Sequence, residues 1–214
     1  MTTTDTSKLL QYQGRVVPWV TRWSGERSKD EVQLSLNPDT QELTLGYPDG
    51  QGESREPSGI LWQREGLSRS GVPEYSQVNT YRQRSAMRKF LCQVCGHKIN
   101  ERPIQWLLAK ENIDHTESGT VLTMSAPTCS SCIPVAQALC PHLNTHGWVI
   151  AKVLEYRLYG VYGWGVLYDA GDQKTKRVNG VYISYDRNYR GLAKTAICAM
   201  QQVAEFTKFT LEDT

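Results

Sequence analysis

Two closely similar cysteine pairs constrain the fold of this chain more than any other feature of its sequence. Cys92 and Cys95 lie in FLCQVCGHKI, and Cys129 and Cys132 lie in APTCSSCIPV. Two cysteines separated by two residues can reach one metal ion from a single tight turn, and Zn²⁺ prefers four such ligands in a tetrahedron. The spacing therefore predicts a structural zinc site whose four thiolates leave no open position for a substrate.

The residues around the two pairs predict the shape of this zinc module. Gly96 follows the first pair, where a turn needs a residue that tolerates a positive φ. The second pair comes directly before IPVAQAL, a predicted short helix whose first turn accepts Pro134. Between the pairs, IQWLLA and TVLTM can form a β-hairpin. A knuckle, a hairpin and a helix that carries the second ligand pair follow each other in treble-clef zinc fingers, so we expect a treble-clef-like module.

The remaining cysteines have less definite roles. Cys140 and His142 lie in CPHL, after the second pair. They are either a small buried thiol beside a surface imidazole or substitutes for one of the four zinc ligands. Cys198 lies on an apolar stripe, and we expect it in the core.

The rest of the sequence predicts a β-rich α+β fold. EVQLSL and ELTLGY alternate apolar and polar residues around a turn sequence at 37–40, which indicates a hairpin. In 148–169, glycines among aromatic residues indicate a bulged or tightly bent hairpin. Residues 190–209 are predicted to form a C-terminal amphipathic helix. Their apolar residues at helical spacing are Leu192, Ala196, Ile197, Met200, Val203, Ala204 and Phe206.

Three segments follow from these patterns, and we expect them to form one integrated unit. Residues 1–79 are β-rich, residues 80–147 contain the zinc module, and residues 148–214 contain the aromatic hairpin and the last helix. The chain begins without a basic region followed by an apolar one, so we expect no secretory signal, and no stretch approaches 18 apolar residues. These features favour a cytoplasmic protein with no membrane partner, in which paired cysteines bind metal rather than form disulfides.

A basic segment before the first cysteine pair suggests a partner. Residues 80–91 are predicted to be a helix with an N-cap at Asn79 or Thr80. Its basic side chains are Arg82, Arg84, Arg88 and Lys89. They either contact nucleic-acid phosphates or form an ordinary solvated face. The net charge is only +2, so the charge of the whole chain does not by itself indicate a nucleic-acid partner. The leading hypothesis is a zinc-stabilised binding or regulatory protein whose partner is nucleic acid or another protein.

An enzyme is the alternative from a different class. Asp114 and His115 lie between the cysteine pairs, where HNH-type nucleases built on treble clefs carry an Asp-His pair that acts with a divalent ion. The residues after Cys132 lack the His or Asn that such nucleases place near the helix. A small-molecule biosynthetic enzyme with an unrecognised site is the other possibility. The sequence carries no serine elbow, phosphate loop or dinucleotide fingerprint.

The order of several motifs resembles a group of uncharacterised actinobacterial proteins of the Streptomyces type. The similar elements are YQGRVVPWVTRWSGE, GILWQRE, RQRSAMRKFLCQVCG, PTCSSC with ALCPHL, and YGVYGWGVLYD. They extend from about residue 12 to residue 205. The resemblance implies one integrated unit and implies no activity. It adds weight to Cys140 and His142, because CPHL matches the group's motif, and it lowers the weight of the Asp114-His115 nuclease.

Overall fold

The computed structural model describes residues 6–28, 31–37, 39, 42–49, 55–56, 59–115, 119–169, 174–186 and 195–212. The strands are β1 (Gln11–Tyr12), β2 (Arg15–Val16), β3 (Thr21–Trp23), β4 (Gln33–Leu36), β5 (Leu43–Gly46), β6 (Leu61–Trp62), β7 (Pro73–Val78), β8 (Ile104–Ala109), β9 (Asp114–His115), β10 (Val121–Thr123), β11 (Trp148–Asp169), β12 (Lys174–Ser184) and β13 (Thr195–Glu212). The helices are α1 (Thr80–Lys89), α2 (Ile133–Leu139) and α3 (Pro141–His146), with short 3₁₀ helices η1 (Ser24–Glu26) and η2 (Lys110–Asn112). The fold is β-rich, as the sequence predicts.

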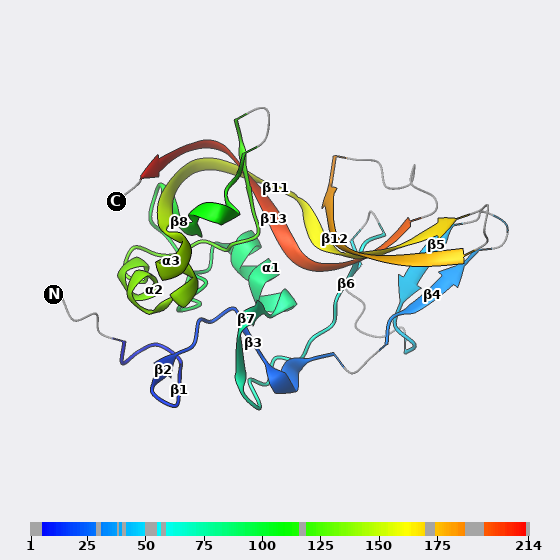
Figure 1. The fold of residues 1–214 in the computed structure, drawn as a ribbon, viewed down its shortest axis with the longest axis horizontal. Helices are drawn as coiled ribbons and strands as arrows, with labels where there is room; N and C mark the ends of the chain where they lie inside the picture. The colour runs from blue at the N-terminus through cyan, green and yellow to red at the C-terminus, as the bar shows by residue number, and fades with distance from the viewer. Residues whose placement is uncertain are drawn as a thin grey trace.

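Two long strands, β11 and β13, run through the whole molecule (Figure 1). They pair antiparallel from Ile150 opposite Glu212 to Leu167 opposite Thr195. The outer edge of β11 pairs first with β8 and then, beyond Gly160, with β12. The outer edge of β13 pairs with β6 in parallel and with β10 antiparallel, and β9 follows β10.

The exchange of partners along β11 and β13 divides the molecule into two ends. We call one the cysteine end: it contains β8, β9, β10, α2, α3 and the loops of the two cysteine pairs. We call the other the hairpin end: it contains β4, β5, β6 and β12. α1 lies between them and packs against β13 (Figure 1). The predicted hairpin around residues 37–40 is confirmed, because β4 pairs antiparallel with β5.

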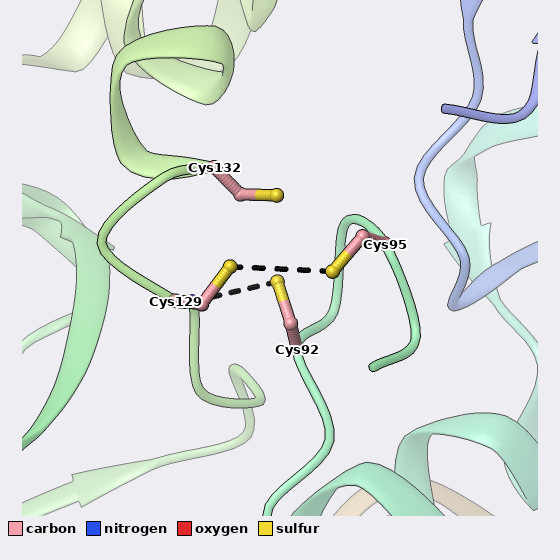
Figure 2. A group of neighbouring side chains, drawn as sticks. All are labelled: Cys92, Cys95, Cys129 and Cys132. Carbon is pink, nitrogen blue, oxygen red and sulfur yellow. Dashed lines mark hydrogen bonds between the residues drawn. The ribbon is translucent and has the colours of Figure 1, made fainter. Parts of the chain in front are cut away.

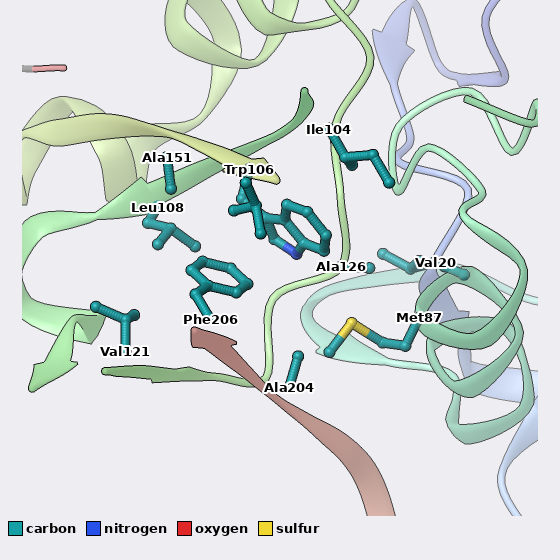
Figure 3. Packing of buried hydrophobic residues seen from close by; sticks show 12 residues of the cluster. Val20, Met87, Ile104, Trp106, Leu108, Val121, Ala126, Ala151, Ala204 and Phe206 are labelled. Atoms are coloured by element: carbon teal, nitrogen blue, oxygen red, sulfur yellow. The ribbon is translucent and has the colours of Figure 1, made fainter. Parts of the chain in front are cut away.

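The main core lies where α1 packs against the sheet (Figure 3). Trp106 of β8 and Phe206 of β13 are completely buried, with ring centroids 4.8 Å apart. Met87 contributes from α1, and Val121 contributes from β10. Burying a side chain of this size contributes roughly 1.5–3 kcal/mol. The core therefore joins elements from the early, middle and late parts of the chain.

α1 is anchored by polar contacts as well as by apolar packing. The Asn79 side chain caps its first turn by accepting a hydrogen bond from the Arg82 backbone N–H at 3.1 Å, which confirms the predicted helix and cap. The Gln83 side chain donates to the carbonyl oxygens of Met124 and Gln202 and accepts from the Gln202 N–H. A fully buried amide with these partners fixes the position of the helix over β13.

The predicted C-terminal helix is wrong, because Thr195–Glu212 forms β13. The part of that prediction at 190–194 lies outside the described residues. β13 is buried on both faces, and Ala196, Ile197, Cys198 and Ala199 in succession are buried. A strand buried on both faces shows no alternation, so its apolar residues also match helical spacing.

The predicted hairpin between the cysteine pairs is also wrong. IQWLLA forms β8, which pairs with β11, whereas the other segment forms β10, which pairs with β9 and β13. The aromatic hairpin expected within residues 148–169 is wrong, because these residues form one continuous strand, β11, whose hairpin partner is β12. The expected bulge is present, since the register of β11 shifts at Gly163. A Cβ atom on Gly163 would lie 2.1 Å from the Cys198 carbonyl oxygen, so only glycine allows this approach.

Candidate metal centre

Four cysteine side chains converge at the cysteine end of the molecule (Figure 2). The sulfur atoms of Cys92, Cys95, Cys129 and Cys132 all lie within 4.8 Å of one another. The Sγ atoms of Cys95 and Cys129 are 4.0 Å apart. Cys92 and Cys132 are buried, and the other two are half-buried. The structure thus brings together the four side chains that the sequence spacing singles out.

A tight turn presents the first pair. The Gly96 N–H donates to the Cys92 carbonyl at 2.8 Å, and the Cys92 N–H donates to the His97 carbonyl at 2.8 Å. Gly96 has a φ of +77°, and a Cβ atom there would lie 2.5 Å from the Trp19 ring. Glycine is therefore required both for the turn and for the close packing of Trp19.

A helix start presents the second pair, as predicted. Cys132 occupies the N-cap of α2, and its N–H donates to the Cys129 carbonyl at 3.0 Å. The Cys129 N–H points at the Cys92 sulfur, 3.4 Å away. The Cys129 sulfur also lies 3.3 Å from the Ser131 hydroxyl. N–H and O–H groups directed at sulfur stabilise the thiolate form that metal binding requires.

The thiols of Cys92, Cys129 and Cys132 differ in pKa. Hydrogen bonds from Cys132 and Cys92 lower the pKa of Cys129. The same bond to Cys129 raises the pKa of Cys92 to about 12, and the pKa of Cys132 is raised for the same reason. One thiolate is thus favoured, while further negative charge is opposed by the neighbouring sulfurs. A divalent cation removes this opposition, and its binding releases the remaining protons.

The donor set fits a closed zinc site. Tetrahedral Zn²⁺ with Zn–S bonds of about 2.3 Å places its sulfurs about 3.8 Å apart, close to the 4.0 Å between Cys95 and Cys129. A small apolar cluster surrounds the sulfurs, including Val94, Ile99 and Leu9. Four soft ligands in such surroundings suit Zn²⁺ and leave no coordination position for a substrate. These four cysteines could therefore hold a metal ion.

The two candidate substitute ligands lie elsewhere. Cys140 is half-buried and packs on a cluster that includes Leu107, Ile133 and Leu143. The His142 Nε2 atom lies 3.2 Å from Glu111 Oε1 on an exposed surface. Neither belongs to the group of four sulfurs found among the described residues. The apolar surroundings of Cys140 agree with the simpler alternative, a small buried thiol.

The basic side chains of α1 do not form one exposed face. Arg82 is buried, and its guanidinium donates to both carboxylate oxygens of Glu26 and to the Thr21 carbonyl. Arg84 is half-buried, 4.7 Å from the Trp62 ring, and Arg88 donates to Glu56 at 2.5 Å. Lys89 is exposed. Arg82 is thus an internal structural residue, since a guanidinium enclosed in this way cannot reach a phosphate.

The Asp114-His115 pair forms the short strand β9, which pairs with β10. The side chains of both residues lie outside the described part of the chain, and so do residues 116–118. The nuclease hypothesis therefore stays a prediction, which cleavage of plasmid DNA in Mg²⁺ or Mn²⁺ by the wild type and by His115→Ala would test.

Two of the cavities formed by the described residues lie along the sheet. One, of about 500 Å³, lies at the cysteine end and is lined by residues that include Gln83, Gln93, Glu111, Thr123 and Tyr182. The other, of about 480 Å³, lies at the hairpin end and is lined by residues that include Arg22, Arg27, Tyr47, Trp164 and Arg177. One lining residue of the first cavity, Gln93, belongs to the loop of the first cysteine pair.

Sequence reasoning missed two groups of polar side chains. Glu26 gives no local signal of burial, since its partner Arg82 is far away in the sequence. Glu111 and His146 lie against each other, with His146 Nδ1 2.6 Å from Glu111 Oε2. The spacing of His142 and His146, four residues apart, could have indicated two imidazoles on one helix face.

Comparison with known protein families, with curated proteins and with solved structures finds no match. The resemblance to actinobacterial proteins therefore stays a prediction. Within the part of the chain that the structure describes, no helix has the length and apolar character needed to cross a membrane.

Proposed function

We propose that this chain is a zinc-stabilised binding protein and that its partner is nucleic acid, held beside the zinc loop. The observation that carries the proposal is the junction between that loop and α1. Leu91 bridges to Lys98 across the loop, and the Ile99 N–H donates to the Phe90 carbonyl at 2.7 Å. The metal ligands and the end of the helix are therefore one local unit.

Exposed cations surround this junction. Lys89 and Lys98 are both exposed, and the Arg102 guanidinium lies 5.0 Å from the centre of the Phe90 ring. Glu101 lies in the same region, with its carboxylate 3.3 Å from the Ser130 N–H. Flexible cations around a half-buried ring suit contact with phosphates. This basic group, Lys89, Lys98 and Arg102, replaces the helix face that the sequence suggests.

The zinc would act as a cross-link rather than as a reactant. Its ligands come from the loop after α1 and from the start of α2, and we propose a treble-clef-like module without the usual hairpin. The first loop also accepts hydrogen bonds from the backbone N–H groups of Trp19 and Val20. Loss of the metal would loosen each of these segments together with the basic group.

Metal content tests the first half of the proposal. We expect about one zinc per chain that survives dialysis against a weak chelator. Cys132→Ser should lose this zinc, whereas Cys140→Ala, a cysteine change in the same region, should keep it. A wild-type protein without this tightly held zinc would overturn the proposal.

Salt-dependent binding tests the second half. For a single-stranded oligonucleotide, Lys89→Ala/Lys98→Ala should weaken binding and reduce the slope of log K against log salt by about 1 to 2. Lys174→Ala/Lys176→Ala removes the same charge from exposed positions of β12 and should leave the slope unchanged. Equal effects of the two double variants would mean that only net charge matters, which contradicts a site at the zinc loop.

A further inference from the structure

A second group of metal-ligating side chains lies on the surface of the cysteine end. It consists of Glu111 from η2 and of His142 and His146 from α3. The ligand atoms of all three lie within 4.8 Å of one another. This group shares no residue with the four cysteines.

Rigid elements place the three side chains. The Lys110 N–H donates to the Gly147 carbonyl at 3.2 Å, which joins the start of η2 to the end of α3. Directly beyond this bond, β8 pairs with β11 through Ala109 opposite Trp148. Leu143 anchors α3 to β8 by packing on Leu107 and Ala109. The group is therefore built on fixed backbone.

The geometry resembles that of a chelate. Each carboxylate oxygen of Glu111 faces one ring: Oε1 is 3.2 Å from His142 Nε2, and Oε2 is 2.6 Å from His146 Nδ1. The two ring centroids are 4.7 Å apart, one helical turn from each other. An ion with ligand bonds of about 2.0–2.2 Å sets its ligand atoms about 3.4 Å apart, so small rotations of the exposed side chains suffice.

The donor set determines which ions fit. Two imidazoles and one carboxylate suit borderline divalent transition metals and do not suit Mg²⁺ or Ca²⁺, which prefer oxygen ligands. Three protein ligands leave at least one coordination position open. The side chains remain 39–47% exposed, so an ion can enter and leave. Glu111 also lines the cavity of about 500 Å³.

We propose that Glu111, His142 and His146 form a second, open metal site that takes an exchangeable transition-metal ion such as Zn²⁺, Ni²⁺ or Co²⁺. The ion lies at the edge of the cavity, where water or a small ligand completes its coordination. The site thus differs from the cysteine centre in ligand chemistry, exposure and exchange. It does not depend on the proposed contact with nucleic acid.

Titration with metal alone tests the site. Protein that retains its cysteine-bound zinc should bind one further equivalent of Ni²⁺ or Zn²⁺ by calorimetry. His146→Ala or His142→Ala should weaken this binding by more than the roughly 10–100-fold that loss of an outer-shell partner causes. Asn144→Ala, an exposed change on the same helix, should bind as the wild type does. No further equivalent, or equal binding by all variants, would overturn the proposal.

A spectroscopic measurement separates the two centres. Co²⁺ added to protein that retains its cysteine-bound zinc should give weak d–d bands without sulfur-to-metal charge transfer, since only nitrogen and oxygen are ligands. The histidine variants should lose these bands but keep the tightly held zinc. Their melting temperature should equal that of the wild type before Co²⁺ is added. Charge-transfer bands from the added Co²⁺ would place it on the thiolates and contradict the proposal.

Discussion

The two ends of the molecule use the same two long strands but are held together by different means. At the cysteine end, short elements such as α2, α3 and β10 pack around β11 and β13, and both groups of metal-ligating side chains found among the described residues lie there. At the hairpin end, β12 pairs with β11 over the whole of its length, and glycines allow the strands to approach closely. We therefore expect the short elements to depend on side-chain cross-links and the long strands to depend on backbone pairing.

Removing the metal from the cysteine centre should have the largest effect, because it should destabilise one end of the molecule and leave the other end folded. Structural zinc contributes roughly 10–16 kcal/mol of apparent binding free energy in small zinc domains. Cys92→Ser/Cys132→Ser should therefore unfold α2 and the first cysteine loop, while β11 and β12 keep their protection. Hydrogen exchange read by mass spectrometry measures both ends at once. Cys140→Ala is the matched control, and equal loss of protection at the two ends would mean that the centre stabilises the whole molecule.

The buried ion pair between Glu26 and Arg82 should give the next largest effect. Arg82→Met leaves the Glu26 carboxylate buried without its partner, so we expect a loss of about 3–5 kcal/mol in the free energy of unfolding. Lys89→Met, an exposed change on the same helix, should change it by less than about 0.5 kcal/mol. Urea denaturation measures both. A double variant, Arg82→Met/Glu26→Gln, that recovers much of the loss would identify the unpaired charge as the cause.

The same pair predicts a pH dependence. Burial raises the pKa of Glu26, but hydrogen bonds from Arg82 and from the Trp23 and Arg69 N–H groups outweigh it and leave the pKa below its ordinary value of 4.5. Such a carboxylate stabilises the fold above the unfolded pKa, and this contribution is lost as the pH falls through the folded pKa. The stability of the wild type should therefore fall below about pH 4.5 more steeply than that of Glu26→Gln.

A glycine substitution should test the hairpin end with a smaller effect. Gly163→Ala places a Cβ atom 2.1 Å from the Cys198 carbonyl oxygen, so the backbones of β11 and β13 must separate. Overpacking of this kind costs about 1–3 kcal/mol. In Gly165→Ala the nearest atom is the flexible Ile197 Cδ1 at 3.1 Å, so this control should lose less. Thermal unfolding ranks the two, and the reverse order would show that strand contact does not limit this end.

The parts of the fold that sequence could predict are those with a local cause. The Asn79 cap, the α1 helix and the β4–β5 hairpin follow from residues close together in the chain, and the four cysteines were identified by the spacing within each pair. β13 could not be recognised, because its edges pair with β6, β10 and β11 and its faces pack on α1 and β5, and sequence periodicity does not contain these contacts.

The candidate site was predictable to the same extent. The cysteine spacing identifies the four candidate ligands, and the motif CPHL contains His142. The contact of His142 with Glu111, however, depends on the long-range pairing of β8 with β11. Arg82 reads as a surface cation because Glu26, its buried partner, lies 56 residues earlier in the chain. Long-range pairing thus decided the role of each residue that local reasoning misplaced.

The central position of β13 has a consequence for how the chain is made. β13 is synthesised after every other described strand, yet Phe206 and Ala204 complete the core that Trp106 and Met87 begin. The apolar surfaces of β8, β11 and α1 therefore emerge from the ribosome before their covering strand exists. Contacts between residues so distant in sequence form slowly, and unpaired strands in the meantime favour aggregation. We expect folding of this protein to be completed only after residue 206 has left the ribosome.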